Sequence, residues 1–233
     1  MHHVTDNGPE DLSCTLFYQR DNFFHFVCYF FRFYFLAWFE LPMFFVKRGR
    51  VKEPMRMMAM EISCYLAMIH LALNVDFMAT FMSFILPFNI VRFGMMQGNW
   101  VQHSFLERTN PLGGGLQNSI TLVHCVYNRD CFNDGYHASH HLHPLRHYLE
   151  HPANLIQNRQ TYYESKAIVF KETSYDYIWW LLMTKNYEKL ASYWVHIGPK
   201  EEEPSCAEIV KMLKEKTRIF SREEITPFLK KGK

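Results

Sequence analysis

Apolar and aromatic residues are concentrated between residues 23 and 94, whereas the chain after residue 152 is mostly polar. Three apolar stretches stand out, at residues 23–46, 57–75 and 77–93. Each comes close to the roughly 20 residues that a helix needs to cross a bilayer. We therefore predict a helical membrane protein. The alternative for all three stretches is the core of a soluble helical domain.

The second and third apolar stretches are predicted to form a transmembrane hairpin. The strongly polar residues of the second stretch are Glu61 and His70, and those of the third are Asn89 and Arg92, near its end. Between the two stretches, Asn74-Val75-Asp76 supplies turn-forming residues where the chain must reverse.

The first apolar stretch has a different character, because it contains Arg32 and Glu40 and ends in Lys47-Arg48-Gly49-Arg50. Burying Arg32 at the centre of a bilayer would cost on the order of 3 kcal/mol. A helix that lies in the interface, with its basic end among lipid headgroups, avoids that cost. We therefore predict that this stretch is interfacial.

The predicted fold class is all-α: a helical integral membrane protein with a transmembrane hairpin at residues 57–93, an interfacial helix at 23–46 and a cytosolic histidine-rich cap. We place the membrane and metal domain at residues 1–151 and a helical cytosolic extension at 152–233. Helices are expected within the extension at residues 175–195 and 207–220, and Ser221-Arg222-Glu223-Glu224 has the form of a capping box.

Composition excludes several classes of protein. The net charge of +2 gives no reason to expect a polyanionic partner, so we predict no nucleic acid binding. The six cysteines form no Cys-x-x-Cys pair, and we interpret them as free thiols that face a reducing compartment. Residues 1–4, Met-His-His-Val, do not resemble the start of a signal peptide.

The strongest chemical signal is His137-Ala138-Ser139-His140-His141, in which histidines three and four residues apart share one face of a helix. The sequence contains no His-Glu-x-x-His motif of zinc hydrolases and no Glu-x-x-His motif of carboxylate-bridged di-iron bundles. An all-histidine metal site remains. Imidazole suits iron, zinc, copper and nickel, so the spacing does not choose the metal.

The phrase Asn133-Asp134-Gly135-Tyr136-His137-x-x-His140-His141-x-x-Pro144 resembles the third histidine box of membrane fatty acid desaturases. This resemblance implies a di-iron centre, held by three histidine boxes and one extra histidine, that activates O2 and removes hydrogens from a lipid acyl chain. It also implies electrons from a cytochrome b5 or ferredoxin type of donor.

The resemblance extends to other histidines. It makes His137, His140 and His141 metal ligands, and Asn99-x-x-x-His103 is similar to an element that would make His103 a ligand and Asn99 a water-mediated one. The alternative for His103 is an interfacial histidine that water satisfies. His2-His3 looks like the end of the second box, which adds both as ligands.

The first histidine box has no match in this sequence. Two explanations compete: a start codon assigned to an internal methionine of the second box, or a chain that has lost part of its site. We favour the first. Both remaining boxes must lie on one side of the membrane, so an even number of crossings must separate them, as a single hairpin provides.

The remaining histidines near the third box are expected to support the ligands rather than to bind metal, and His124 is one of them. Imidazole ligands need hydrogen-bond partners that fix their tautomer. Asp134 and Glu150 are the expected partners. The supporting group comprises His124, His143, His147 and His151.

The end of the chain, Lys230-Lys231-Gly232-Lys233, has the form of a dilysine retrieval signal of the endoplasmic reticulum, or is a solvated basic tail. Two alternatives to a desaturase stay open. The first is a lipid hydroxylase of the same group, and the second is a catalytically silent membrane protein that binds metal through its histidines.

Overall fold

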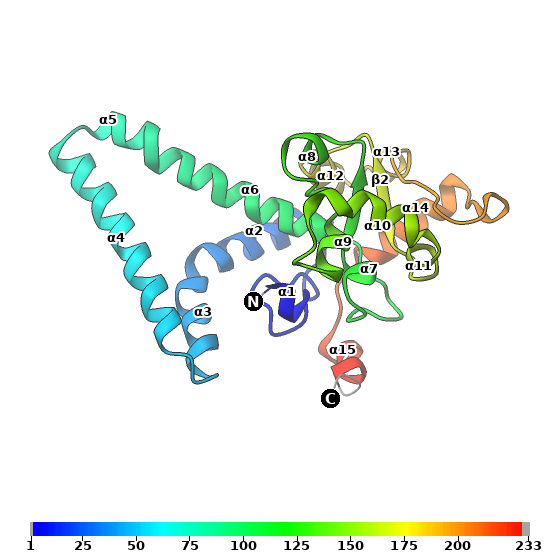
Figure 1. The fold of residues 1–233 in the computed structure, drawn as a ribbon, viewed down its shortest axis with the longest axis horizontal. Helices are drawn as coiled ribbons and strands as arrows, with labels where there is room; N and C mark the ends of the chain where they lie inside the picture. Colours follow the sequence, from blue (N-terminus) through cyan, green and yellow to red (C-terminus); the bar gives the residue numbers. More distant parts are fainter. Residues whose placement is uncertain (1, 230–233) are drawn as a thin grey trace. The chain divides into compact units, whose positions relative to one another are not determined.

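The structure is a computed structural model that describes residues 2–229 (Figure 1). The dilysine sequence at residues 230–233 lies outside the described residues. The described chain divides into two compact units. A helical unit contains Cys28–Met96, and a second unit contains the described residues up to Val27 and from Gln97 onward.

The predicted all-α class is confirmed, since helices dominate and the described strands are two short ones. The helical unit and its flanks are built from α2 (Phe23–Phe31), the π-helical turn η1 (Arg32–Leu36), α3 (Ala37–Val46), α4 (Lys52–Asn74), α5 (Phe77–Thr80), the π-helical turn η2 (Phe81–Ile85) and α6 (Leu86–Gln102).

Three helical segments are long and apolar enough to cross a membrane: Phe23–Val46, Lys52–Asn74 and Phe77–Gln102. The second and third correspond to the predicted hairpin but extend beyond its expected ends. The residues that flank the predicted hairpin include lysine, glutamine and tryptophan, which are compatible with a helix. The helices therefore continue beyond the point where the apolar pattern stops.

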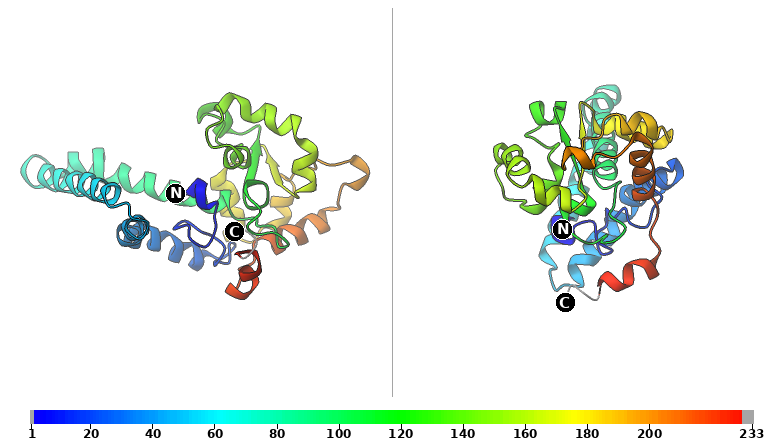
Figure 2. Two further views of the ribbon diagram at one scale, coloured as in Figure 1. Left: turned by 60° about the horizontal axis from the view of Figure 1, so that its bottom comes forward. Right: turned by 90° about the vertical axis from the view of Figure 1, so that its right-hand side faces the viewer.

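The turn of the hairpin lies where the sequence predicts it. Helix α4 ends at Asn74, and the carboxylate of Asp76 accepts a hydrogen bond of 2.7 Å from the backbone N–H of Ala79. This side-chain cap begins α5 and reverses the chain. Helices α4 and α6 run in opposite directions from this turn (Figures 1 and 2).

Polar residues of the apolar helices pair with one another inside the helical unit. Arg92 of α6 forms an ion pair with Glu61 of α4. The hydroxyl of Tyr34 donates to Asn89 Oδ1 at 2.6 Å. Such pairing is the usual way in which polar groups are tolerated at membrane depth.

The first apolar segment is not one straight helix. The π-helical turn η1 separates α2 from α3, and the axis of α3 turns away from that of α2 (Figure 1). Pro42 lies inside α3. Arg32 reaches the carboxylate of Glu40 at 3.2 Å.

The second unit contains a two-stranded parallel sheet. Strand β1 (Ile120–Val123) pairs with β2 (Ile168–Lys171), with Ile120 opposite Ile168. Parallel strands need a long crossover. Here the crossover carries α8 (Val126–Asp130), α9 (His137–Leu142), η3 (Tyr148–Glu150), α10 (His151–Gln157) and α11 (Arg159–Glu164).

Helix α9 packs against β1 and against α7 (Gly115–Asn118). A side chain at Gly115 would meet the Cβ of His141 at 2.6 Å and the carbonyl of Ala138 at 2.9 Å. Gly115 therefore permits the close approach that positions the histidine helix. The buried hydrophobic cluster that includes α9 comprises Leu116, Ala138, Tyr162 and Ala167.

The C-terminal region consists of α12 (Tyr175–Met183), α13 (Tyr187–Ala191), η4 (Lys200–Glu202), α14 (Cys206–Lys216) and α15 (Arg222–Leu229). The helix expected at residues 175–195 is interrupted, because Lys185 adopts a positive φ of 56° and Asn186 caps α13. The predicted capping box is present, with reciprocal bonds between Ser221 and Glu224. All six cysteines are free.

The division of the chain into units does not follow the expected boundary at residue 151. Residues on both sides of it belong to the second unit. The assignment of 152–233 as a separate extension stays a prediction.

Candidate metal centre

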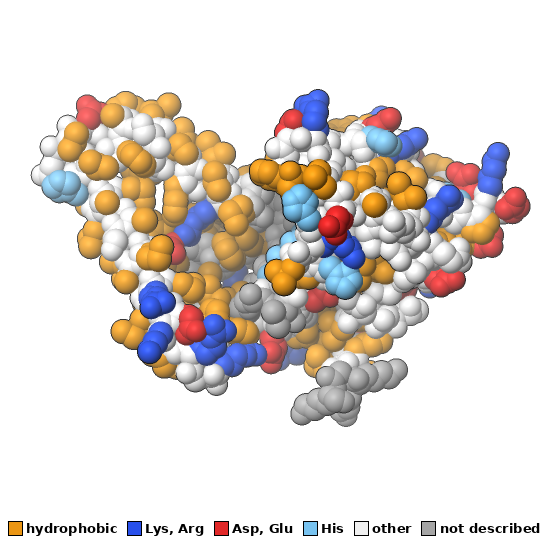
Figure 3. Space-filling view, viewed as in Figure 1, with side chains coloured by type: hydrophobic (Ala, Val, Ile, Leu, Met, Phe, Trp, Pro, Cys, Tyr) orange, Lys and Arg blue, Asp and Glu red, His pale blue; other side chains and the backbone are white. Residues whose placement is uncertain are grey.

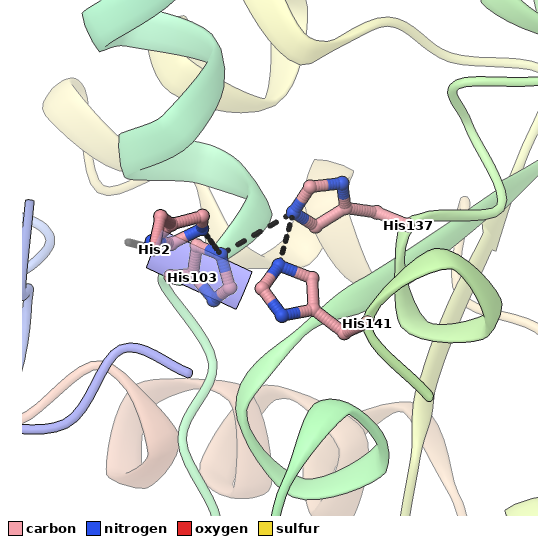
Figure 4. Close-up of side chains that lie close together, drawn as sticks. All are labelled: His2, His103, His137 and His141. Carbon is pink, nitrogen blue, oxygen red and sulfur yellow. Dashed lines mark hydrogen bonds between the residues drawn. The ribbon is translucent and has the colours of Figure 1, made fainter. Parts of the chain in front are cut away.

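Four histidines converge in the second unit: His2, His103, His137 and His141 (Figure 4). One ring nitrogen from each lies within 4.8 Å of the others. The Nε2 atom of His103 is 3.1 Å from that of His2 and 3.3 Å from that of His137, and the Nε2 atoms of His137 and His141 are 3.0 Å apart. This arrangement can hold a metal ion.

Three separate segments supply these side chains. His2 lies on α1 (His2–Thr5), and His103 follows the last residue of α6. His137 and His141 lie one turn apart on α9, so both face the same way, as the spacing predicts. The site therefore exists only after residues about a hundred positions apart have been brought together.

Three of the four imidazoles are tied at Nδ1 to hydrogen-bond acceptors. His2 Nδ1 lies 2.6 Å from the carboxylate of Asp11, and His141 Nδ1 lies 2.7 Å from that of Asp6. His103 Nδ1 lies 2.6 Å from the carbonyl oxygen of Asn118. Because a carbonyl or an ionised carboxylate only accepts, each Nδ1 carries the proton. In the neutral rings, each Nε2 then presents a lone pair.

The Nε2 atoms of His2 and His103 are 3.1 Å apart, so two lone pairs face each other, an arrangement that two neutral imidazoles do not favour. A cation among them removes the repulsion, and outer hydrogen bonds of this kind are usual around histidine ligands. The arrangement thus fits a metal ion better than it fits a network of hydrogen bonds.

Burial favours the neutral form of the imidazoles, which is the form that binds metal. Burial, and then the charge of neighbouring His141, lower the pKa of His103 and His137 well below the ordinary value. Both residues are almost completely inaccessible. His137 Nδ1 has no hydrogen-bond partner among the described residues.

A second pair of histidines lies beside the four-histidine cluster. His3 Nε2 is 3.0 Å from His140 Nε2, and the ring of His3 is 5.1 Å from that of His141. Burial, and then the charge of His140, lower the pKa of His3 to about 4. All six histidines that the sequence marked as ligands therefore lie in one region.

The other candidate residues lie in different surroundings. The side chain of Asn99 donates to the carbonyl of Ser13 at 3.2 Å, and Ser13 Oγ lies 3.1 Å from His2 Nδ1. Asp134 accepts a bond from Gln102 at 3.3 Å. His124 is exposed and lines a separate cavity of about 500 Å³. Asn99 thus connects to the cluster through Ser13, whereas the contacts of Asp134 and His124 are elsewhere.

The carboxylates that hold the cluster are not the expected ones. Asp6 and Asp11 take the role that was predicted for Asp134 and Glu150. The feature of the sequence that could have identified these two carboxylates is their closeness to the histidines, since both follow His2-His3 within ten residues. Burial raises the pKa of Asp11, but the hydrogen bond and charge of His2 outweigh it and the net pKa is lowered.

Residues that follow the third box in the sequence contact α9 through Ser139. Ser139 Oγ lies 2.9 Å from His151 Nδ1, and Arg146 donates to the same oxygen at 2.7 Å. Asn154 accepts a bond from Ser139 at 3.1 Å. His151 thus forms its hydrogen bond with Ser139 of α9, and its role in supporting the ligands stays a prediction.

The family model described as "Fatty acid desaturase" matches residues 1–173. Comparisons with curated proteins and with solved structures gave no match. The matched region includes all six clustered histidines and covers most of the chain. The chain belongs to the fatty acid desaturase family.

Proposed function

We propose that this protein inserts a double bond into a lipid acyl chain, using O2 at a di-iron centre. The family match supports the reaction class, and the convergence of Nε2 lone pairs supports the metal. The proposed ligands are the four clustered histidines together with the neighbouring pair: His2, His3, His103, His137, His140 and His141.

The irons, when bound, would supply the oxidising power that an unactivated C–H bond requires. The chain's own residues do the positioning. Asp6, Asp11 and the carbonyl of Asn118 keep the protons on Nδ1 and so aim the lone pairs inward. Burial of His103, His137 and His141 limits the access of water to that side of the cluster and so limits side reactions.

We further propose that two segments, α4 and the continuous α5–α6, cross the membrane. Because His2 and His103 lie side by side in one site, the chain between them must cross an even number of times. The segment Phe23–Val46 contains Arg32 and Glu40 and is followed by the basic residues Lys47, Arg48 and Arg50, so we assign it to the interface. We expect electrons from a cytochrome b5 or ferredoxin type of donor and residence in the endoplasmic reticulum.

The test is metal analysis and product analysis of the detergent-purified protein. We expect iron in the wild type and its loss in His103→Ala, while His124→Ala retains it. Incubation with an acyl lipid, O2 and a reductant should give an unsaturated product by mass spectrometry. A hydroxylated product would identify a lipid hydroxylase instead, and zinc without any product would favour the silent metal-binding protein.

A further inference from the structure

The connection between α3 and α4 carries a dense positive charge. Five of the ten residues 47–56 are basic and one is acidic. Figure 3 shows basic side chains gathered at the lower left, over this connection. All five basic residues are exposed, and together they form what we call the basic patch: Lys47, Arg48, Arg50, Lys52 and Arg56.

A defined turn gathers these charges. Gly49 has a φ of +72°, its N–H donates to the carbonyl of Val46 at 2.9 Å, and that of Arg50 donates to Phe45 at 3.0 Å. This is a glycine-dependent helix end, which reverses the chain immediately after α3. The arginines on either side of Gly49 are consequently folded back onto the last turn of the helix.

Aromatic rings fix two of the guanidinium groups. The guanidinium carbon of Arg48 lies 3.6 Å from the ring centre of Phe44, and that of Arg50 lies 5.3 Å from Phe45. Arg50 also pairs with Glu53 at 2.8 Å. Cation–π contacts hold the charges in place without neutralising them, and the single carboxylate leaves the patch strongly positive.

Apolar side chains border the patch on both helices. Phe39, Met43 and Val46 of α3 are half or more exposed, as is Met55 of α4. A cluster of basic residues bordered by exposed apolar and aromatic side chains matches the boundary between lipid headgroups and acyl chains. A nucleic acid would not account for the apolar border.

The opposite end of α4 has no such charge. The turn Asn74-Val75-Asp76 contains no lysine or arginine. This asymmetry follows the excess of basic residues on the cytoplasmic side of membrane proteins, where anionic lipids are enriched.

We propose that the basic patch binds the headgroups of anionic phospholipids. The phosphate and carboxylate oxygens of such a headgroup accept hydrogen bonds from arginine and lysine, and its acyl chains lie against the apolar border. Each basic residue near an anionic bilayer contributes about fivefold in affinity. The proposal concerns lipid binding alone and does not depend on the metal site or on catalysis.

The experiment uses the full chain in a non-ionic detergent, with an equal mixture of phosphatidylserine and phosphatidylcholine that have identical acyl chains. Native mass spectrometry counts the lipids that stay bound. The test variant replaces four basic residues of the patch: Lys47→Gln, Arg48→Gln, Arg50→Gln and Lys52→Gln. The matched control removes four exposed charges elsewhere: Lys200→Gln, Lys211→Gln, Lys214→Gln and Arg222→Gln.

We expect the wild type and the control to retain phosphatidylserine in preference to phosphatidylcholine, and the patch variant to lose at least tenfold of that preference. Raising the salt concentration should weaken the preference of the wild type in the same direction. Equal retention of both lipids by the wild type would overturn the proposal. So would a patch variant that behaves like the control, with circular dichroism confirming that both are folded.

Discussion

The carboxylate of Asp6 lies 2.7 Å from Nδ1 of His141, although 135 positions separate the two residues. This contact links the N-terminal segment directly to the histidine helix α9. It also fixes the ring so that Nε2 faces the other imidazoles. The N-terminal segment therefore does more than contribute His2 and His3, because it orients a side chain of the third box.

We predict that Asp6→Ala weakens metal binding by 10- to 100-fold, as is typical when the outer partner of a histidine ligand is removed. The measurement is a titration of metal-free protein with Fe²⁺ under nitrogen. Asp130→Ala is the control, because Asp130 is exposed and pairs with Arg129 on the surface. Equal affinities of the two variants would contradict a positioning role for Asp6.

A second prediction concerns the histidine pair beside the cluster. If His3 and His140 hold one of two irons, His140→Ala should lower the iron content by about half, whereas the four-histidine cluster keeps the other. Elemental analysis of the purified variants measures this directly. An unchanged iron content in His140→Ala would show that the pair is not a ligand set.

Local features of this chain were predictable because neighbouring residues determine them. The spacing of His137, His140 and His141 places them on one helix, and the Ser221-x-x-Glu224 pattern forms its capping box. The hairpin turn at Asp76 also follows from local sequence. In each case the signal lies within a few residues.

Long-range contacts were not predictable in the same way. The pairing of Asp6 with His141 depends on tertiary structure, and nothing near either residue marks it. The strands β1 and β2 have four residues each, too few to show a period. Arg20 is completely buried, although arginine is rarely found in a core.

Arg20 gives a third prediction. Its guanidinium group donates hydrogen bonds to backbone carbonyls in three places: the N-terminal segment, the residue after His103 and the end of α14. Burial lowers the pKa of Arg20 to about 9, and the nearby charge of Arg108 adds to the effect. The acceptors are Thr15, Leu16, Tyr18, Ser104, Lys216 and Arg218.

Lysine offers three donors in place of five, so Arg20→Lys leaves several buried carbonyls without a partner. Each such group costs about 1–3 kcal/mol. We expect the variant to lose at least about 2 kcal/mol in the free energy of unfolding, measured by denaturation in detergent. Arg222→Lys, on the exposed start of α15, should change it by less than about 0.5 kcal/mol. A stable Arg20→Lys protein would disprove the argument.

The buried pair of Glu107 and Lys216, 2.7 Å apart, predicts a pH dependence. Burial alone would raise the pKa of Glu107, but the charge and hydrogen bond of Lys216 lower it to about 2 from the ordinary 4.5. A lowered carboxyl pKa stabilises the fold fully above the ordinary value. That stability is lost as the pH falls from about 4.5 to about 2.

Replacing the carboxylate by Glu107→Gln leaves the ammonium of Lys216 buried and unpaired, which should cost about 3 kcal/mol at pH 7. The difference in unfolding free energy between wild type and variant should stay constant above pH 5 and shrink toward pH 2. Metal-free protein is used, so that protonation of the histidines affects the stability of the wild type and of the variant equally. The double variant Glu107→Gln/Lys216→Met should recover most of the loss.

The number of membrane crossings can be tested with single cysteines, because the two possible paths of Phe23–Val46 place the α3–α4 connection on opposite sides. The reporters are Val51→Cys in that connection, Val75→Cys in the hairpin turn, and the native Cys206 at the start of α14, each exposed. Each is studied alone, with all other cysteines changed to serine, in sealed membrane vesicles.

If Phe23–Val46 is interfacial, a membrane-impermeant maleimide should label residue 51 and Cys206 in sealed vesicles of the same orientation. It should label residue 75 only in sealed vesicles of the opposite orientation. Permeabilised vesicles, in which all three should react, provide the control for reactivity. Labelling of residue 75 together with Cys206, and of residue 51 separately, would mean that the bent first segment crosses the membrane. Because His2 and His103 must stay on one side, only one of the two later helices could then cross. The basic patch would in that case lie on the side opposite the metal centre, away from the leaflet in which anionic lipids are enriched.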